Sequence, residues 1–381
     1  MKRLFTGILA ASLVFIFVGI GGAWEPSEKG YQGAPRPFLW SPVVNKMMDT
    51  MKYKKKPPYT IGFCNTSISN IWRVALLHEI QYYASLHKDL IKKLIITDAN
   101  DDPTKQIADM QSLIQRGVDI LLVSAGQSAA MDPVVTRAMK KGIPVVMVDR
   151  RVTSDNFVSF VYASDLTIGR WMAQWTVEQL NYKGNVVLLA GMAGASPAEE
   201  RIRGAKEVYM QYPGIKILDL QYSDWSPAKG KKITAAWIQK YGKKIDAVTS
   251  LHGLQGWGAV EAYLEAGWDP KDIPLQTGSD LNGQLQLCHK NKIPLMIIHF
   301  PPIMGGAALE TCLDVLQGKT VPWMKQVRNN LIVTKGYETK SVRADKYVYQ
   351  EVKMEAAGDL ILSVDFPFPY DAHNFKVDYP K

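Results

Sequence analysis

The segment Ile143-Pro-Val-Val-Met-Val-Asp-Arg150 decides the fold of this chain. Its apolar run lies between Gly142 and a charged pair, which is typical of a strand buried in a parallel sheet. Ligands of open α/β sheets bind just outside the carboxyl ends of such strands. The carboxylate of Asp149 offers acceptor oxygens and the guanidinium of Arg150 offers donors, so the pair suits a ligand rich in hydroxyl groups. A structural ion pair that ends the strand is the alternative interpretation.

Strand and helix patterns alternate on both sides of this segment. In the first half of the chain, the patterns predict strands at 60–63, 94–97, 120–123 and 144–148 and helices at 70–87, 103–116 and 133–141. In the second half they predict strands at 185–189, 215–219, 247–250, 275–277 and 294–298 and helices at 197–212, 229–241, 256–266 and 305–316. Such alternation makes parallel sheets covered on both faces. We therefore predict an α/β protein with two doubly wound parallel-sheet lobes that face each other across a cleft.

Short motifs in a fixed order carry a family resemblance. They are Asn70-Ile-Trp72, Asp101-Asp-Pro-Thr-Lys-Gln106, Arg116-Gly-Val-Asp-Ile-Leu-Leu122, the segment ending in Asp149-Arg150, Glu200-Arg-Ile-Arg-Gly204, Asp224-Trp225 and Gly278-Ser-Asp280. In this order and spacing, the chain resembles a type I periplasmic solute-binding protein of the ribose- and galactose-binding group over residues 59–334. No single motif is specific, and their order is what makes the resemblance strong.

The resemblance implies a domain organisation and a function. The N-terminal lobe is expected at 59–163 plus 300–328 and the C-terminal lobe at 164–299 plus 329–345, with hinge connections near 163–165, 300–302 and 328–331. Such a protein binds a small polar ligand, usually a sugar or polyol, in a cleft that closes on it. It then delivers the ligand to a membrane ABC permease, and we expect it to act as a monomer.

The resemblance also places binding residues on both sides of the cleft. It implies ligand contacts from Asn70, Trp72, Asp149 and Arg150 on the first lobe and from Arg201, Trp225 and Asp280 on the second. Guanidinium forks and carboxylates engage neighbouring hydroxyls through charge-assisted hydrogen bonds. Tryptophan rings offer flat apolar faces to a sugar ring. Core packing is the alternative role for each tryptophan.

Two histidines depart from the pattern of sugar-binding relatives. His252 stands where Asn or Asp is usual, and His299 stands where Gln is frequent. A neutral imidazole would hydrogen-bond a hydroxyl as donor and acceptor. Alternatively, His252, His299 and Asp280 would gather to bind an anionic ligand or a metal ion. The two positions therefore leave the identity of the ligand open.

The two ends of the chain predict export and additional segments. Lys2-Arg3, an apolar stretch to Ile20 and the small residues Gly21-Gly22-Ala23 indicate a secretory signal peptide at 1–23 and a periplasmic location, with an uncleaved membrane anchor as the alternative. Residues 24–58 indicate an N-terminal arm with a short helical stretch near 43–51. Residues 346–381 form a C-terminal extension, and its segment Asp365-Phe-Pro-Phe-Pro-Tyr370 would dock on a partner or on the protein itself.

Other functional classes find little support. The formal net charge is +9, but the lysines are scattered and no basic stripe interleaved with aromatic residues indicates nucleic-acid binding. The chain has no Gly-x-Ser-x-Gly elbow, phosphate-binding glycine loop with lysine or His-Glu-x-x-His motif, so we expect neither an enzyme nor a cofactor. The three cysteines, Cys64, Cys288 and Cys312, do not form a disulfide framework, although a Cys288–Cys312 bridge and three separate thiols both remain open.

A ligand receptor for signalling is the alternative function. Periplasmic relatives that report an autoinducer to a membrane sensor kinase have a long N-terminal arm and a tryptophan after the first strand, as do residues 24–58 and Trp72 here. The fold alone does not decide between transport and signalling.

Overall fold

The computed structural model describes residues 46–364. The predicted signal peptide, most of the N-terminal arm and the Asp365–Tyr370 segment lie outside the described residues. Between residues 46 and 364, none of the helices combines the length and the apolar character needed to cross a membrane.

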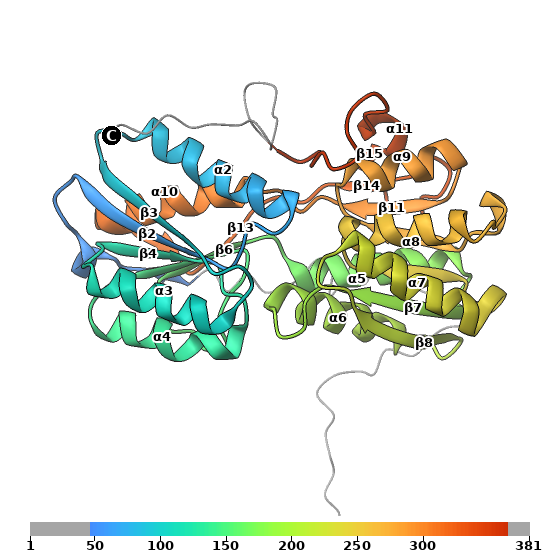
Figure 1. The fold of residues 1–381 in the computed structure, drawn as a ribbon, viewed down its shortest axis with the longest axis horizontal. Helices are drawn as coiled ribbons and strands as arrows, with labels where there is room; N and C mark the ends of the chain where they lie inside the picture. The colour runs from blue at the N-terminus through green and yellow to red at the C-terminus, as the bar shows by residue number, and fades with distance from the viewer. Residues whose placement is uncertain (1–45, 365–381) are drawn as a thin grey trace, which may run out of the picture.

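The first lobe is built on a six-stranded sheet of parallel strands in the order β13-β6-β5-β4-β2-β3. Its strands are β2 (Tyr59–Asn65), β3 (Ile91–Asp98), β4 (Ile120–Val123), β5 (Val145–Val148), β6 (Ser159–Tyr162) and β13 (Met324–Gln326). Helices α2 (Ile71–Leu86) and α10 (Met304–Leu316) cover one face, and α3 (Pro103–Gln115) and α4 (Ser128–Lys140) cover the other (Figure 1). Because both faces are covered, the central strands are apolar along their whole length.

The second lobe repeats this plan on a seven-stranded sheet in the order β15-β14-β11-β10-β9-β7-β8. Its strands are β7 (Gly184–Ala190), β8 (Ile215–Tyr222), β9 (Ala247–Ser250), β10 (Leu275–Gly278), β11 (Leu295–Ile298), β14 (Leu331–Val333) and β15 (Lys346–Tyr347). Helices α5 (Asp165–Gln179) and α6 (Ser196–Tyr209) pack on one face, and α7 (Pro227–Tyr241), α8 (Gly253–Glu265) and α9 (Asn282–Asn291) on the other. Short 3₁₀ turns lie at Gly242–Lys244 and Pro270–Asp272. The pairing of β14 with β11 is antiparallel, and β15 is parallel to β14, so these two strands run opposite to the other strands of this sheet.

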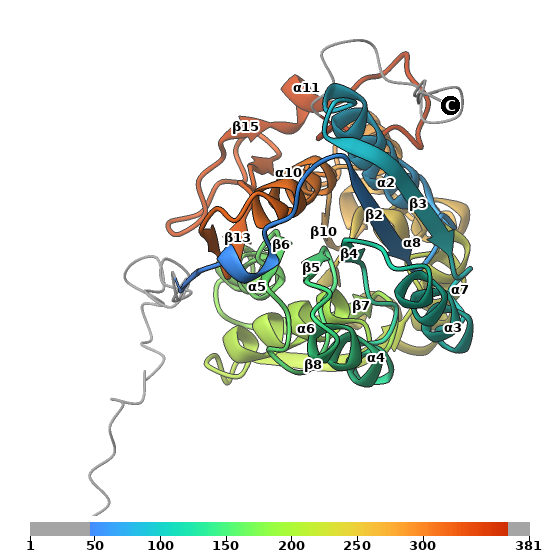
Figure 2. The ribbon, with the colours of Figure 1, turned by 90° about the vertical axis from the view of Figure 1, so that its left-hand side faces the viewer.

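The chain passes between the two sheets three times (Figure 1), and Figure 2 shows the first lobe from its outer end. The connections are 163–164 between β6 and α5, 299–303 between β11 and α10, and 327–330 between β13 and β14. The first lobe therefore receives α10 and its edge strand β13 only after most of the second lobe has been formed in sequence order. The second lobe likewise receives β14 and β15 last.

The predicted two-lobed, doubly wound α/β architecture is confirmed. Most predicted strands and helices lie within a few residues of the observed ones. The sequence patterns did not indicate β6, α5 or α9, because these elements carry polar and apolar residues without clear periodicity. The helix predicted at 133–141 begins earlier, at Ser128, and contains Pro133 within its length. Proline favours the first turn of a helix, but Pro133 lies in the second turn of this one, so the predicted start is wrong.

The helical stretch predicted near 43–51 is wrong over its described part. Met47–Met48 forms the short strand β1, which pairs antiparallel with β12 (Val321–Pro322), and Met51–Tyr53 forms a single 3₁₀ turn. An isolated helix of this length is marginal, because nucleation costs more than a few hydrogen bonds return. Pairing with β12 therefore decides the local structure.

The C-terminal extension begins as part of the second lobe. After β15, the short helix α11 (Val348–Glu351) leads into residues 352–364, which we call the C-terminal strap. The strap lies along α9: the side chain of Asn282 donates to the carbonyls of Lys353 and Ala357, at 2.9 and 3.0 Å. Leu281 and Ile361 form an antiparallel bridge. The strap thus fixes the loop between β10 and α9.

All three cysteines are free and buried, so the alternative of three separate thiols is confirmed. Burial raises the pKa of the Cys64 thiol to about 12 and raises the pKa values of Cys288 and Cys312 further. The thiols are therefore protonated and unreactive in the folded protein.

Candidate functional site

The site begins where the parallel strands of the first lobe end. Asn65 ends β2, Ser124 follows β4 and Asp149 follows β5. Because these strands are neighbours in the sheet, their carboxyl ends bring the three side chains together. Asp149 has a left-handed backbone with φ of 62°. Such a conformation costs about 1–3 kcal/mol and is found where function or packing requires a fixed side-chain direction.

A buried arginine that the sequence predictions missed joins these strand ends. Arg73, in the first turn of α2, donates to Asp149 Oδ2 at 2.5 Å, to Asn65 Oδ1 at 2.6 Å and to Ser124 Oγ at 3.0 Å. Its Nε donates to the carbonyl of Ser67 at 3.3 Å. The guanidinium is 2% exposed, so these partners replace its water shell.

The charge on Arg73 survives burial. Burial lowers the pKa of Arg73 to about 10, and the nearby carboxylate of Asp149 opposes that shift. The side chain therefore remains protonated at neutral pH and holds Asp149 in place. The sequence signal for it is weak: Arg73 directly follows Trp72 in a helix, and its main partner lies 76 residues further along the chain.

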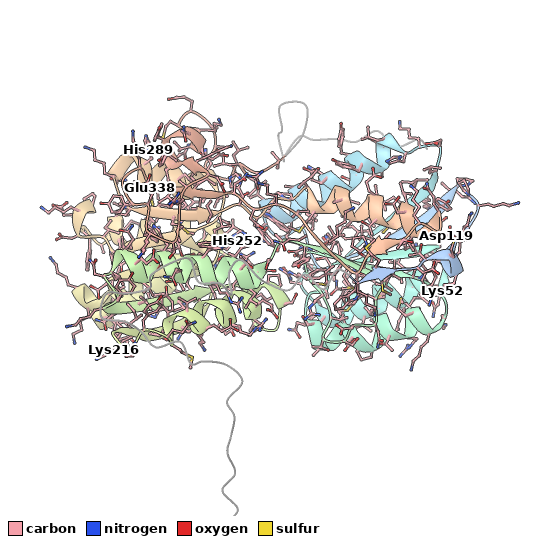
Figure 3. All side chains as sticks on the ribbon, turned by 180° about the vertical axis from the view of Figure 1, so that it is seen from behind. Lys52, Asp119, Lys216, His252, His289 and Glu338 are labelled. Atoms are coloured by element: carbon pink, nitrogen blue, oxygen red, sulfur yellow. The ribbon has the colours of Figure 1, made fainter. Side chains whose placement is uncertain are left out.

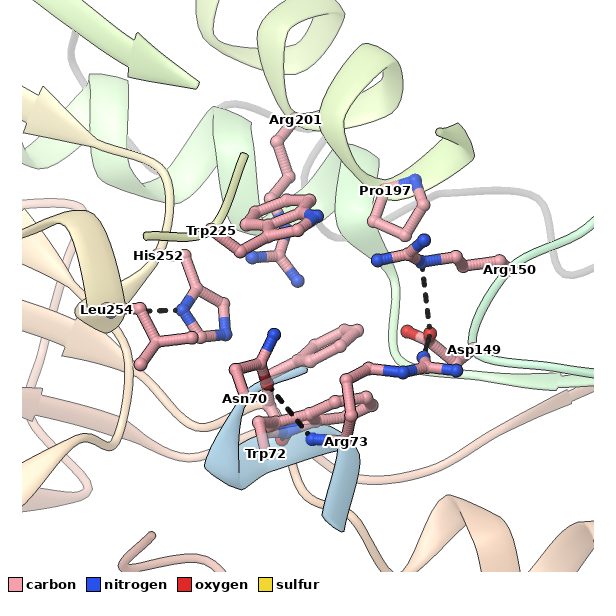
Figure 4. Close-up of a pocket in the computed structure, with 11 residues that line it drawn as sticks. Asn70, Trp72, Arg73, Asp149, Arg150, Pro197, Arg201, Trp225, His252 and Leu254 are labelled. Carbon is pink, nitrogen blue, oxygen red and sulfur yellow. Dashed lines mark hydrogen bonds and ion pairs between the residues drawn. The ribbon is translucent and has the colours of Figure 1, made fainter. Parts of the chain in front are cut away.

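The aromatic part of the site connects α2 with the second hinge connection. Trp72 stacks on Phe300 with ring centroids 5.0 Å apart, and its indole N–H donates to the Phe300 carbonyl at 2.6 Å. Asn70 begins α2 as its N-cap, because its Oδ1 accepts the backbone N–H of Arg73 at 3.1 Å. Asn70 thus turns its side-chain NH₂ toward the cavity (Figure 4).

Arg201 is the counterpart of Arg73 on the second lobe. From α6 it donates through Nε to Asp165 Oδ1 at 2.7 Å and through Nη1 to the Leu251 carbonyl at 2.7 Å. Its guanidinium lies 4.2 Å from the centroid of the Phe300 ring, a cation–π distance. Burial raises the pKa of Asp165 to about 7, although the charge of Arg201 counteracts that shift. Arg201 is thereby held rigidly between a carboxyl group and a ring.

Trp225 and His252 complete the second-lobe wall. Trp225 has φ of 58°, and its ring lies directly over Gly191, where an added Cβ would come within 2.1 Å of it. Only glycine at 191 leaves room for this ring. His252 lies edge-on to Trp225 with centroids 5.4 Å apart, between the two lobes as Figure 3 shows.

The protonation of His252 follows from its contacts. Its Nδ1 accepts the backbone N–H of Leu254 at 3.2 Å as the N-cap of α8, so a neutral ring carries its proton on Nε2. Burial lowers the pKa of His252 well below its usual range, and the charges of Arg201 and Arg150 act in the same direction. The ring is therefore neutral and offers an N–H donor.

These residues line a pocket between the lobes (Figure 4). The predicted residues that line it are Asn70, Trp72, Asp149, Arg150, Arg201, Trp225 and His252. The lining residues that sequence reasoning missed are Arg73, Pro197, Leu254 and Phe300. Both lobes contribute charged and aromatic groups, as the cleft interpretation requires.

Two predicted residues, Asp280 and His299, are not part of this lining. Asp280 accepts the backbone N–H of Phe300 at 3.3 Å, and Nε2 of His299 lies 3.4 Å from Glu351 of the extension. Side chains at successive positions of an extended segment point in opposite directions, so Phe300 rather than His299 lines the cavity.

Among residues 46–364, no group of three His, Cys, Asp or Glu side chains has the arrangement of a metal site. The metal interpretation of His252, His299 and Asp280 is therefore wrong.

The neutrality of His252 is directly testable. We expect no titration of its imidazole between about pH 5.5 and 8, because burial and two neighbouring guanidinium groups hold its pKa below the ordinary value near 6.5. Two-dimensional NMR of the imidazole C–H signals, assigned with the variant His252→Asn, measures this, with the exposed His289 as internal reference. A midpoint near 6.5 for the His252 signal would contradict the buried geometry.

Comparisons with known proteins agree with this architecture. Residues 61–320 match a family model described as a periplasmic binding protein domain. The ribose import binding protein RbsB of Bacillus subtilis is 31% identical over 267 residues, which cover 70% of this chain and 84% of that protein. The xylitol-binding protein of Mycolicibacterium smegmatis is 32% identical over 175 residues, which span 46% of this chain and 50% of that relative. The solved fructose-binding periplasmic domain of a hybrid two-component system has a TM-score of 0.67 at 28% identity, covering 73% of this chain and 92% of that one.

Proposed function

We propose, since this chain belongs to the periplasmic binding protein family in its type I ribose- and galactose-binding group, that it binds a sugar or polyol between its lobes. The observation that carries the proposal is the interlobe cavity with polar and aromatic groups from both lobes. Arg150 and Asp149 face it from one side, and Arg201 and Trp225 face it from the other. Such a set hydrogen-bonds hydroxyl groups and covers the apolar face of a sugar ring.

The roles of the lining residues follow from their surroundings. Arg73 and Asp165 hold Asp149 and Arg201 in position, while Arg150, Asn70 and His252 direct N–H groups at the ligand. Trp72, Phe300 and Trp225 supply the aromatic surfaces. No step of this role requires a bond to be broken, so the protein acts as a binding protein without catalysis.

We place this binding in the periplasm, with delivery of the ligand to a membrane ABC permease by a monomeric protein. The import function named for the ribose-binding relative supports transport. The alternative is a receptor that signals to a membrane sensor kinase, and the fructose-binding domain of a hybrid two-component system favours it. Affinity capture from membranes with the protein as bait distinguishes them: permease subunits support transport, and a sensor kinase supports signalling.

A thermal-shift screen of the protein against monosaccharides and polyols tests the proposal. A ligand that binds only the folded state increases the free energy of unfolding by about 2.7 kcal/mol at a hundredfold excess over its Kd. This stabilisation raises the melting temperature. Ribose, xylitol, fructose, arabinose and galactofuranose are the first compounds to try. The proposal fails if no member of a broad sugar, polyol and sugar-derivative panel raises the melting temperature.

Closure of the cleft should accompany binding. Because Arg150 and Arg201 come from different lobes, one ligand contacts both only when the lobes approach. We expect a saturating ligand to reduce the radius of gyration in small-angle scattering and to change the fluorescence of Trp72 and Trp225. The variant Arg150→Ala with the same compound is the control. If scattering and fluorescence both stay unchanged at saturation, the closure mechanism is excluded.

A further inference from the structure

The polar groups that face the cavity are mostly donors. Arg150 Nη1, Arg201 Nη2 and Trp225 Nε1 are buried, and none finds a hydrogen-bond partner among residues 46–364. A buried donor without a partner is costly, so each of these atoms requires a ligand acceptor or water. In Figure 4, both guanidinium groups project toward the space between the two lobes.

His252 and Asn70 add to this excess of donors. The acceptor atom of His252 is used by the Leu254 N–H at 3.2 Å, and that of Asn70 by the Arg73 N–H at 3.1 Å. The N-cap contact therefore leaves His252 with a donor alone. In Asn70 the N-cap contact turns the oxygen toward the helix and the NH₂ group toward the cavity.

Acceptors are scarce on the same surface. Asp149 is the single carboxylate of the described lining, and its Oδ2 already receives Arg73 at 2.5 Å, Ser124 at 3.4 Å and Arg150 Nε at 3.5 Å. Asp165 is paired with Arg201 outside the lining. On this lining, Asp149 Oδ1 is the carboxylate oxygen that remains to accept hydrogen bonds from the ligand.

The charges show the same imbalance. On the lining itself, the three guanidinium groups of Arg73, Arg150 and Arg201 face one carboxylate, that of Asp149. Asp280 lies outside this lining, and its Oδ2 is buried without a hydrogen-bond partner among residues 46–364. His252 adds no charge because it is neutral. In a site removed from water, guanidinium groups that outnumber the carboxylates favour an anionic ligand.

We propose that the ligand of this cavity is a sugar acid, an aldonate or uronate whose carboxylate lies between Arg150 and Arg201. This inference rests on the proposed sugar-binding function and narrows it. Each hydroxyl of a neutral sugar brings a proton that needs an acceptor, whereas a carboxylate only accepts hydrogen bonds. Its negative charge also complements the guanidinium groups that predominate on this lining.

Calorimetry with matched pairs tests the proposal on the intact protein. The pairs are D-galactose with D-galacturonate, D-ribose with D-ribonate and xylitol with D-xylonate. We expect the acid of at least one pair to bind about tenfold or more tightly than its neutral partner, because charge-assisted hydrogen bonds are the stronger ones. Equal or tighter binding of the neutral partners overturns the sugar-acid inference and leaves sugar binding intact. Binding of neither set overturns both, and tighter binding of D-ribose 5-phosphate than of D-ribonate overturns the inference alone.

Two substitutions of His252 make the test residue-specific. Asn and Asp both cap helices well, so each can take over the contact with the Leu254 N–H. His252→Asn keeps an N–H toward the cavity and should retain the preference for the acid. His252→Asp places an acceptor oxygen and a negative charge there and should reduce the acid-to-neutral affinity ratio by about tenfold or more. Equal ratios in the two variants would overturn the proposal, and circular dichroism verifies that both are folded.

Discussion

Replacing Arg150 with alanine is expected to weaken ligand binding by at least about a hundredfold while the protein remains folded. Its Nη1 has no partner within the described chain and faces the cavity, so ligand acceptors are its natural partners. Removing the donor leaves those acceptors buried and unpaired, which costs about 1–3 kcal/mol and more for charged groups. Isothermal titration calorimetry with any compound identified by the thermal-shift screen measures the loss.

The neighbouring Arg151 offers a matched control. Its side chain is partly exposed, it pairs with Asp155 at 3.4 Å, and it does not line this cavity. Arg151→Ala removes the same side chain one residue further along the chain and should leave the affinity unchanged. If Arg150→Ala binds as tightly as the wild-type protein, the pair with Asp149 is only a structural bridge, which was the alternative interpretation of the sequence.

Asp149→Asn is expected to lower the free energy of unfolding by about 3–5 kcal/mol, in addition to weakening binding. The substitution leaves the guanidinium of Arg73 charged and 2% exposed, with its closest counter-charge removed. Removing one partner of a buried pair has a cost of this size. Asn tolerates the left-handed backbone at position 149 as Asp does, so the change isolates the charge. Urea denaturation monitored by circular dichroism measures the difference.

A double-mutant cycle separates the ion pair from other effects. Arg73→Met removes the guanidinium while it keeps much of the side-chain volume. The loss of unfolding free energy in the double variant with Asp149→Asn should be smaller than the sum of the losses in the two single variants, because neither charge remains buried alone. A loss below about 1 kcal/mol for Asp149→Asn would show that Asn65 and Ser124 alone suffice to stabilise Arg73.

The parts of the site that periodicity alone predicts lie at strand ends. Asp149 and Arg150 end a recognisable apolar run, so their place at the sheet edge follows from periodicity alone. Arg73 gives no such signal, since it lies within a helix whose faces are both largely buried. Its role depends on which strands are neighbours, and this is a property of the assembled sheet.

The arrangement of side chains at the end of β11 could not be predicted for a similar reason. His299 and Phe300 are adjacent, and a shift of one residue decides which side chain faces the cavity. Contacts that no local pattern reveals settle the choice: Glu351, from the C-terminal extension, lies beside His299, and Trp72 stacks on Phe300. The edge strands β13 and β15 escaped prediction for the same reason, because each is only two or three residues long and exists through its pairing.

The three passages between the lobes also determine the order in which the protein can fold during synthesis. When a ribosome has completed residue 162, the first lobe still lacks α10, which covers one face of its sheet, and its edge strand β13. The apolar face under α10, which includes Val146 and Val161, then stays uncovered until residues 304–326 emerge. A ribosome-stalled chain ending near residue 300 should therefore be cleaved by protease in the first lobe, whereas a chain extended past residue 345 should be protected. Neither lobe is a fragment that can be cut out of the sequence in one piece.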